Sequence, residues 1–412
     1  MNRTCFLLCL FTLLMSVCSG ENDVRSITPV VKPGIDVLLE RNFDLVNGKH
    51  IGLITNATGI TRDFRSTIDV LYETPNVQLT ALFGPEHGVR GDIEAGQLVP
   101  RYTDERTDVT VFSLYGKTRK PTPDMLSDVD VLIYDIQDIG SRAYTFIYTM
   151  ALGMQAAQEK GIPFIVLDRP NPLGGIRVEG NVLDPAFSSF IGLYPIPYIY
   201  GMTVGELAQL FNHEFGINCE LHVVPMAGWR RDMLFEDTGL IWVPTSPHVP
   251  HASVAFFVAT TGCLGELHTV SEGVGYTSPF EIIGAPWINS RQLADNLNAR
   301  QLPGVYFRPM SFRPYYLTWA DQQCKGVQIH IADYNTFQPA ATQIHILDAI
   351  QHLYPERKIL QTDRTSMFDK ANGTDRIRLE LEKGTPATEI IQSWQPALQH
   401  FLTIRKKYLL YD

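Results

Sequence analysis

Several carboxylate-bearing residues in this chain come directly after apolar segments. Glu86 and His87 follow one such segment, Asp135 and Asp138 follow a second, and Asp168 follows a third. Carboxyl and imidazole groups that are held close together can give and take protons in a reaction. The pattern therefore predicts acid–base chemistry on a polar ligand.

Glu86 is the residue for which the sequence most favours a catalytic role. Glutamate is a poor turn former, and the neighbouring Pro and Gly fix the backbone without needing its side chain. A short polar residue after a strand often only forms a turn or caps a helix. That alternative stays open for Asn56, Thr58 and Asp168, and His87 is either functional or structural.

Other catalytic and cofactor motifs do not occur in the sequence. It lacks a G-x-G-x-x-G dinucleotide loop, a Walker loop, a G-x-S-x-G nucleophile elbow, an H-E-x-x-H zinc helix and a C-x-x-C pair. We therefore expect neither a nucleotide cofactor nor a bound metal. A metal site on Glu86, His87 and Asp135 has no support from the spacing of these residues.

Five short apolar segments in the first half of the chain predict the strands of a parallel sheet. Each is continuously apolar, which is typical of strands buried on both faces. Residues Tyr144–Lys160 have a helical composition that stops at Gly161. This alternation predicts an α/β fold with a Rossmann-like, doubly wound, mostly parallel sheet. The predicted strands are His50–Thr55, Val77–Phe83, Val109–Leu114, Val129–Tyr134 and Ile162–Leu167.

The second half of the chain predicts one more helix and strand and then a smaller domain. Thr203 and Glu206 form a capping-box pattern before a helix, and Glu220–Val224 predicts a strand. Residues 241–287 are loop-rich and interrupted by prolines, apart from a helix near Ser253–Thr261. We predict a catalytic domain over residues 21–288 and an auxiliary α+β domain over residues 289–412. The expected elements of the latter are a helix capped by Ser290, strands Val305–Phe307 and Gly326–Ile331, and helices Pro339–Leu353 and Ala387–Lys406.

Residues 1–20 have the pattern of a secretory signal peptide. Arg3 precedes the apolar segment Cys5–Val17, which is shorter than the ~20 residues that a membrane-spanning helix needs. We therefore predict export to the periplasm, with no transmembrane segment. Cys18 leaves a lipid-anchored form open, although Val17 stands where a small residue is usual.

The charge balance argues against a nucleic-acid partner. Without the leader the chain has 33 basic and 44 acidic residues, a net charge of −11, and no basic stripe. The three cysteines after the leader are odd in number and have no metal-like spacing. We expect Cys219, Cys263 and Cys324 to be small buried hydrophobic side chains.

Ordered strings along the chain resemble one family, from about Leu38 to Tyr411. They include T-N-x-T-G, G-P-E-H-G, S-L-Y-G, D-I-Q-D-I-G-S-R-x-Y-T, D-R-P-N-P, G-M-T-x-G-E and P-F-E-x-x-G-A-P-W. These strings are similar to those of the exo-β-N-acetylmuramidases, the NamZ group. The resemblance implies a Rossmann-like N-terminal domain, a smaller C-terminal domain and a cleft between them. It also implies a glycosidase that releases N-acetylmuramic acid from the non-reducing ends of peptidoglycan fragments, so amino sugars or muropeptides are the expected partners.

The resemblance and the strand-end positions together suggest roles for individual residues. Glu86 is the expected acid, and Arg142 or Arg90 is expected to bind the lactyl carboxylate, because a guanidinium pairs with a planar anion through two hydrogen bonds. The candidates for the second catalytic carboxylate, in order of preference, are Glu272, Asp138 and Asp135. The other expected substrate-binding residues are Asn56, Thr58, His87, Tyr115, Gln137, Tyr144, Asp168, Arg169, Asn171 and Glu266.

The chain departs from the family pattern in three strings near the expected cleft, one of which is Glu266-Leu267-His268-Thr269 in place of E-G-T-N. Val274 and Tyr276 replace the arginine and threonine of an S-E-G-R-G-T string, and His248 replaces the asparagine of S-P-N-x-P. Loss of the arginine removes a cation, which leaves open how the lactyl carboxylate is held. A non-catalytic periplasmic binder of muropeptides or amino sugars is the alternative function. Retaining, inverting and substrate-assisted mechanisms stay open as well.

Overall fold

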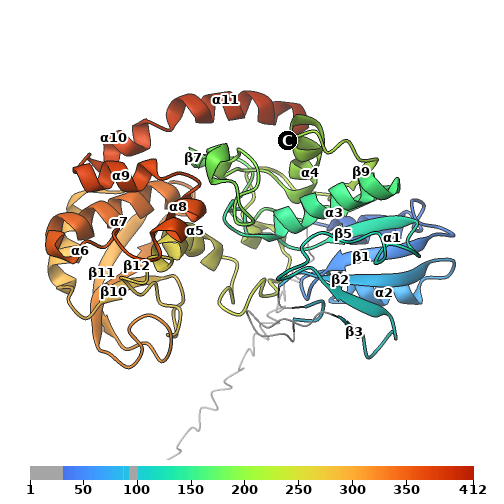
Figure 1. Ribbon diagram of the computed structural model, residues 1–412, viewed down its shortest axis with the longest axis horizontal. Coiled ribbons are helices and arrows are strands. Elements are labelled where there is room, and N and C mark those ends of the chain that lie inside the picture. Colours follow the sequence, from blue (N-terminus) through green and yellow to red (C-terminus); the bar gives the residue numbers. More distant parts are fainter. Residues whose placement is uncertain (1–30, 87, 92–100) are drawn as a thin grey trace, which may run out of the picture.

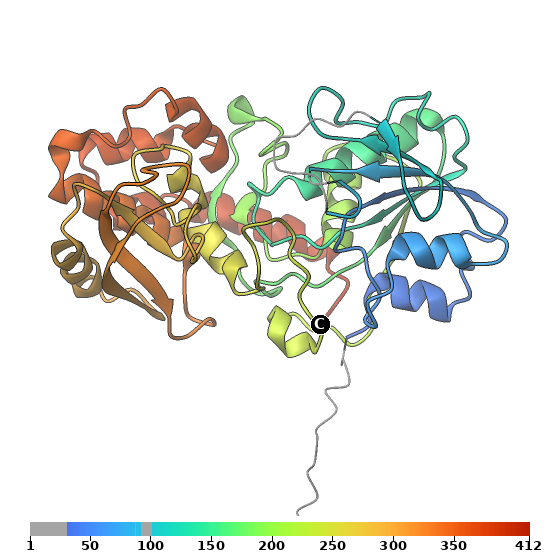
Figure 2. The same ribbon diagram turned by 90° about the horizontal axis from the view of Figure 1, so that it is seen from below.

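The computed structural model describes residues 31–86, 88–91 and 101–412, which form two lobes (Figure 1). The predicted leader, Cys18 and His87 lie outside the described residues. In the part of the chain that is described, no helix has the length and apolar character needed to cross a membrane. Figure 2 shows the two lobes side by side, the first lobe in blue and teal and the second in orange and red.

The first lobe is built on a seven-stranded sheet in which all neighbouring strands are parallel, apart from one edge pair. Its strands are β1 (His50–Thr55), β2 (Gln78–Gly84), β3 (Arg101–Thr103), β4 (Thr110–Ser113), β5 (Val131–Asp135), β6 (Phe164–Leu167) and β9 (Leu221–Val224). Their order across the sheet is β3-β4-β2-β1-β5-β6-β9. The predicted mostly parallel α/β sheet is thus confirmed. The chain turns in opposite directions from β1 and β5, so a crevice is expected beyond their carboxyl ends.

Helices cover both faces of this sheet, as a doubly wound fold requires. On one face α1 (Gly34–Glu40) and α2 (Thr67–Glu73) pack on β1, β2, β6 and β9. On the other face lie α3 (Phe146–Lys160) and α4 (Val204–Glu214). Helix α3 ends where Gly161 adopts a left-handed conformation, φ 75°, and α4 begins with the predicted capping box of Thr203 and Glu206.

The second lobe combines a small antiparallel sheet with a group of helices. The sheet has the order β10-β12-β11, formed by β10 (Ile282–Ala285), β12 (Cys324–Ile331) and β11 (Val305–Phe312). The helices are α5 (Val254–Gly265), α6 (Ser290–Ala299), α7 (Pro339–Leu353), α8 (Thr365–Asn372), α9 (Arg376–Lys383) and α10 (Ala387–Gln392). Shorter elements are β7 (Glu179–Val182), β8 (Pro197–Ile199) and the 3-10 turns Pro185–Phe187, Phe235–Thr238, Pro355–Arg357 and Lys406–Tyr408.

Three local predictions for this lobe are wrong. Strand β10 lies in a region predicted to be a loop, and it pairs with β12 across the predicted boundary at residue 288. The side chain that caps α6 is Asn289, which accepts a hydrogen bond from the backbone N–H of Gln292, so Ser290 is not the cap. Residues 387–406 form two helices, since Pro396 begins a new one. The division into domains at residue 288 stays a prediction.

The last helix, α11 (Gln395–Arg405), runs back from the second lobe to the first along the top of Figure 1. Arg405 donates hydrogen bonds to the carbonyls of Gly175 and Gly201. Beyond it, the hydroxyl of Tyr411 donates to the buried carboxylate of Asp168 at 2.5 Å. The C-terminal residues therefore tie the two lobes together at the sheet edge.

Candidate active site

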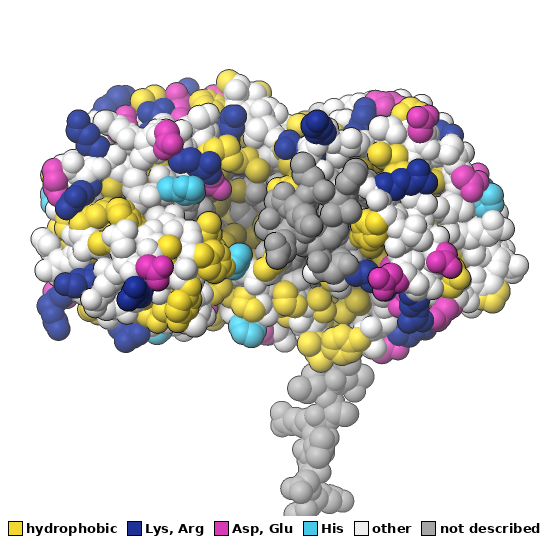
Figure 3. All heavy atoms as spheres, turned by 60° about the horizontal axis from the view of Figure 1, so that its bottom comes forward, with side chains coloured by type: hydrophobic (Ala, Val, Ile, Leu, Met, Phe, Trp, Pro, Cys, Tyr) yellow, Lys and Arg dark blue, Asp and Glu magenta, His cyan; other side chains and the backbone are white. Residues whose placement is uncertain are grey.

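Figure 3 shows the molecule hollowed between its two lobes. On the first lobe the candidate site starts at Glu86, which follows β2 and is half-buried. Burial raises the pKa of the Tyr115 hydroxyl, and the charge of Glu86 and a hydrogen bond to it raise that pKa further. Burial also raises the pKa of Tyr144, with smaller contributions from the charges of Asp138 and Glu86. The charges of both carboxyl groups thus act on the Tyr144 hydroxyl.

Asp138 is the buried carboxyl group of this cluster. Its Oδ2 accepts hydrogen bonds from the backbone N–H of Gly140 at 2.8 Å and from the hydroxyl of Tyr200. Its Oδ1 has no hydrogen-bond partner among the described residues. Burial raises the pKa of Asp138 to about 6, so this carboxyl changes its charge near neutral pH. A buried acceptor without a partner is costly unless a ligand satisfies it.

The polar residues after β1 and β5 hold the strand-end loops in shape. The Oδ1 atom of Asn56 accepts from the N–H and the hydroxyl of Thr58, at 2.9 and 2.6 Å. The N–H of Gln137 donates to the Thr58 hydroxyl oxygen at 2.9 Å, and the Gln137 amide donates to the carbonyls of Asp138 and Pro170. The turn-forming alternative thus accounts for the contacts of Asn56, while Thr58 and Gln137 also line the neighbouring pocket.

Asp135, one of the candidates for the second catalytic carboxylate, is held by several contacts within the chain. Its side chain is fully buried. Both of its oxygens bind Arg169, at 2.5 and 2.9 Å, and one also accepts from the hydroxyl of Thr67. Arg169 donates further to the carbonyl of Ile60 at 2.8 Å. Asp135 and Arg169 thus form a buried ion pair, and catalytic or substrate-binding roles for them stay predictions.

Asp168 and Asn171 build the fold at the next strand end. Besides Tyr411, Asp168 accepts from the hydroxyl of Thr203 at 2.7 Å and from the N–H of Gly205 at 2.8 Å, and its side chain is fully buried. Asn171 accepts from the N–H of Leu173 and donates to the carbonyl of Met202, both at 2.9 Å. These hydrogen bonds hold the strand-end loops together, and a role of Asp168 and Asn171 in substrate binding stays a prediction.

The two arginines expected to bind the lactyl carboxylate are engaged elsewhere. Arg142 is fully buried and donates to the carbonyls of Asn181, Ile196 and Asn372. Arg90 forms two hydrogen bonds with the carboxylate of Asp104, at 2.8 and 3.0 Å, and a third with Asp69 at 3.0 Å. Arg142 is thus enclosed by the chain, and Arg90 is already paired with two carboxylates. Binding of the lactyl carboxylate by either arginine stays a prediction.

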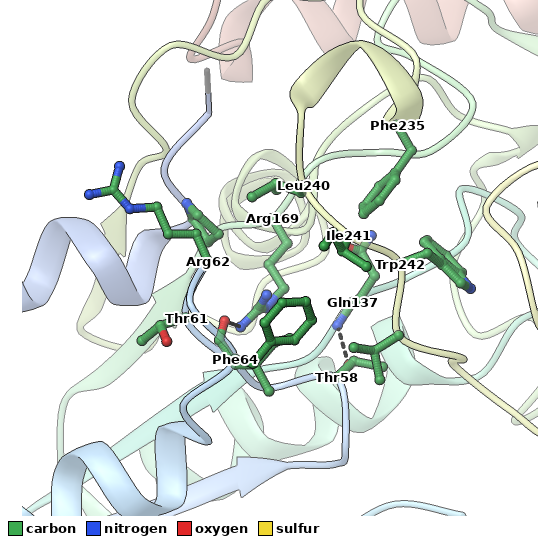
Figure 4. Close-up of a pocket in the computed structure, with 13 residues that line it drawn as sticks. Thr58, Thr61, Arg62, Phe64, Gln137, Arg169, Phe235, Leu240, Ile241 and Trp242 are labelled. Carbon is green, nitrogen blue, oxygen red and sulfur yellow. Dashed lines mark hydrogen bonds between the residues drawn. The ribbon is translucent and has the colours of Figure 1, made fainter. Parts of the chain in front are cut away.

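A pocket lies beside this cluster, at the carboxyl ends of β1 and β5 (Figure 4). Thr58, Gln137 and Arg169 line it from the sheet side, and Thr58 and Gln137 are joined by the bond drawn as a dashed line. Two further segments border the pocket, one after β1 and one from the turn before α5. Their lining residues are Ile60, Thr61, Arg62 and Phe64, and Phe235, Leu240, Ile241, Trp242 and Val243.

Glu272 and Glu266 belong to the second lobe, close to the end of α5. Glu272 is 9% exposed, and its carboxyl group packs against Gly265, where an added Cβ would lie 2.7 Å from the Glu272 Cδ. Burial, with a smaller contribution from the charge of Glu266, raises the pKa of Glu272 to about 7. Glu266 itself pairs with Arg364 at 3.0 Å. Among the described residues, no hydrogen bond or ion pair joins Glu272 to Glu86 or Asp138.

Comparison with known proteins gives the family. Residues 51–253 match the N-terminal domain of exo-beta-N-acetylmuramidase NamZ, and residues 258–411 match its C-terminal domain. The chain belongs to the NamZ family. It is 51% identical over 400 residues to the peptidoglycan beta-N-acetylmuramidase NamZ of Bacillus subtilis strain 168, covering 96% of each chain.

Solved structures agree with this membership. A DUF1343 family protein from Bacteroides fragilis superposes with a TM-score of 0.89 at 47% identity, covering 93% of this chain and 100% of that one. A second DUF1343 protein from the same organism has a TM-score of 0.74 at 29% identity, covering 93% and 99%. The two-lobed arrangement described above is therefore that of the NamZ family fold.

Sequence reasoning missed several residues of the candidate site. Tyr200, from the segment after β8, contacts Asp138, and the hydroxyl of Tyr144 donates to Thr245 at 2.9 Å and is also bonded to Ser246. Tyr200 and Thr245 lie in no motif and at no predicted strand end, whereas Ser246 begins the string that departs from the family's S-P-N-x-P. Among the described residues, no cluster of three His, Cys, Asp or Glu side chains is arranged to hold a metal ion.

The raised pKa of Glu272 predicts a loss of stability with increasing pH. Between about pH 4.5 and 7 the unfolded chain ionises at this residue while the folded chain keeps the proton, so the free energy of unfolding falls by up to about 3 kcal/mol. Glu272→Gln should remove this component. Urea unfolding at pH 5 and pH 8 should show that the free energy of unfolding of the variant, relative to that of the wild type, is higher at pH 8 than at pH 5. Glu389→Gln, at an exposed position, is the control, and an equal change in both variants would contradict the prediction.

Proposed function

We propose that this chain is a glycoside hydrolase that releases terminal N-acetylmuramic acid from the non-reducing ends of peptidoglycan fragments. Its relative from Bacillus subtilis, 51% identical over nearly the whole length of both chains, is a peptidoglycan beta-N-acetylmuramidase. The observation in this chain that carries the proposal is the pair of carboxyl groups, Glu86 and Asp138, whose charges both act on the hydroxyl of Tyr144. Glycoside hydrolysis needs two such groups.

The two carboxyl groups differ in a way that suggests separate roles. Glu86 is half-buried and borders the tyrosine hydroxyl of Tyr115, so it is our candidate for the acid that protonates the leaving oxygen. Asp138 is buried and presents one oxygen without a partner. An acetamido N–H of the sugar would satisfy that oxygen, which would orient the acetamido group toward the anomeric carbon. Glu272 remains the alternative second carboxyl group, with a pKa raised by burial.

Product analysis with a disaccharide tests the proposed activity. The protein should split N-acetylmuramic acid linked β-1,4 to N-acetylglucosamine into the two free sugars. The disaccharide with the opposite order, which has N-acetylglucosamine at its non-reducing end, is the matched control and should stay intact. Tight binding of the first disaccharide without cleavage would instead support the alternative, a non-catalytic binding protein.

The pattern of residues 1–20 supports export, with the periplasm as the proposed location. Fractionation of cells that express the full chain tests this proposal. Recovery in the soluble periplasmic fraction is expected. Recovery in the membrane fraction that is lost in a Cys18→Ser variant would indicate the lipid-anchored form.

A further inference from the structure

Three neighbouring aromatic rings lead from the core of the second lobe to its surface. The rings of buried Phe312 and half-buried Tyr276 have centroids 5.7 Å apart. The ring of Tyr276 in turn stacks on Tyr315, with centroids 6.0 Å apart and an angle of 23° between the planes. Tyr315 is 68% exposed, and its neighbour Tyr316 is 47% exposed. We call Tyr276, Tyr315 and Tyr316 the tyrosine platform.

The backbone fixes this platform in place. The N–H of Tyr315 donates to the carbonyl of Gly275 at 2.7 Å. Gly275 has φ +90°, and a Cβ at this position would lie 2.3 Å from the carbonyl oxygen of Tyr316, so only glycine permits the contact. The indole N–H of Trp319 donates to the carbonyl of Thr269 at 3.1 Å. Rings that are already held in place lose little entropy when a ligand stacks on them.

The platform also connects to the candidate active site. The hydroxyl of Tyr316 is hydrogen bonded to Nε2 of His248 at 2.6 Å. His248 lies in a short turn closed by a hydrogen bond from the N–H of Val249 to the carbonyl of Ser246, at 3.0 Å. Ser246 in turn is bonded to the hydroxyl of Tyr144. A single turn therefore connects the exposed tyrosines to Tyr144, whose hydroxyl is influenced by the charges of both Glu86 and Asp138.

We propose that the tyrosine platform binds the saccharide on the leaving-group side of the cleaved bond, by stacking its sugar ring on Tyr315. This inference rests on the proposed function. An enzyme that removes the terminal sugar must place that sugar at the carboxyl groups, so the part of the substrate that extends outward is the remaining glycan. A hexopyranose has an apolar face of C–H groups that suits an exposed aromatic ring, and the tyrosine hydroxyls can bond its hydroxyls.

The test compares substrates with and without a ring in the leaving group. For the disaccharide, Tyr315→Ala should raise KM about tenfold with little change in kcat. For N-acetylmuramyl fluoride, whose leaving group is a single atom, the same variant should match the wild type within about twofold. Tyr315→Phe keeps the ring and should behave like the wild type. Tyr306→Ala is the matched control, because Tyr306 is 67% exposed and lies at the opposite end of β11.

The outcomes separate this inference from the proposed function. If the wild type cleaves the disaccharide and Tyr315→Ala has an unchanged KM, the platform does not bind the leaving saccharide. If KM rises equally for the fluoride, Tyr315 acts on the muramic acid side, and the inference is wrong. If KM rises only for fragments that carry a peptide stem, the platform binds peptide instead. Absence of cleavage by the wild type would contradict the proposed function, and titration of the protein with chitotriose would then test the platform directly.

Discussion

A Glu86→Gln variant should release N-acetylmuramic acid from the disaccharide about a thousandfold more slowly than the wild type. Loss of a general acid typically costs a factor of this size. The amide keeps the shape of the side chain but cannot donate a carboxyl proton to the leaving oxygen. The expected loss in kcat/KM should be smaller for the 4-nitrophenyl glycoside of N-acetylmuramic acid, since nitrophenolate leaves readily without a proton.

The informative measurement is the difference between the losses in kcat/KM for the disaccharide and for the 4-nitrophenyl glycoside. An equal loss for both would show that Glu86 does not act as the acid, and wild-type turnover in a folded variant would remove it from the mechanism. Glu105→Gln, at an exposed position in the same lobe, is the control. An Asp138→Asn variant should instead lose similar factors for both substrates, because orienting an acetamido group does not depend on the leaving group.

The buried strands could be predicted from the sequence because burial on both faces leaves a continuous apolar segment. β1 has the predicted bounds His50–Thr55, and β5 and β6 begin within two residues of prediction. β10 could not be predicted in this way. It has four residues between prolines, and its place in the sheet depends on the close approach of Gly326, where a Cβ would lie 1.9 Å from the carbonyl oxygen of Ile283.

Half of the candidate site could be predicted for a related reason. In a parallel sheet, residues that follow strands meet at one edge, so Glu86 and Asp138 were expected to be neighbours. The sequence could not show which polar side chains form their hydrogen bonds with other residues of the chain. Asp135 and Asp138 differ by three positions, yet Arg169 neutralises the first, whereas a tyrosine hydroxyl and backbone N–H groups contact the second. That difference depends on tertiary contacts alone.

The role of Arg142 also depends on tertiary contacts, and its replacement should have a large effect on stability. Replacement by Met should lower the free energy of unfolding by about 3–5 kcal/mol, because three buried carbonyl oxygens lose their donor. One of these carbonyls belongs to Asn372 at the end of α8, and the others belong to the strand-pair region of residues 181–196. The side chain therefore joins residues of the two lobes, and its loss should lower the stability of the folded chain.

The measurement is urea unfolding of the full chain, together with KM for the disaccharide at a temperature where the variant is folded. Arg230→Met, at an exposed arginine paired with Asp232, should change stability by less than about 0.5 kcal/mol. A structural Arg142 predicts a large loss of stability with KM preserved. A raised KM with unchanged stability would instead support Arg142 as the residue that binds the lactyl carboxylate. The buried carbonyl contacts make that result unexpected, because a guanidinium enclosed by the chain on all sides has no surface to offer a substrate.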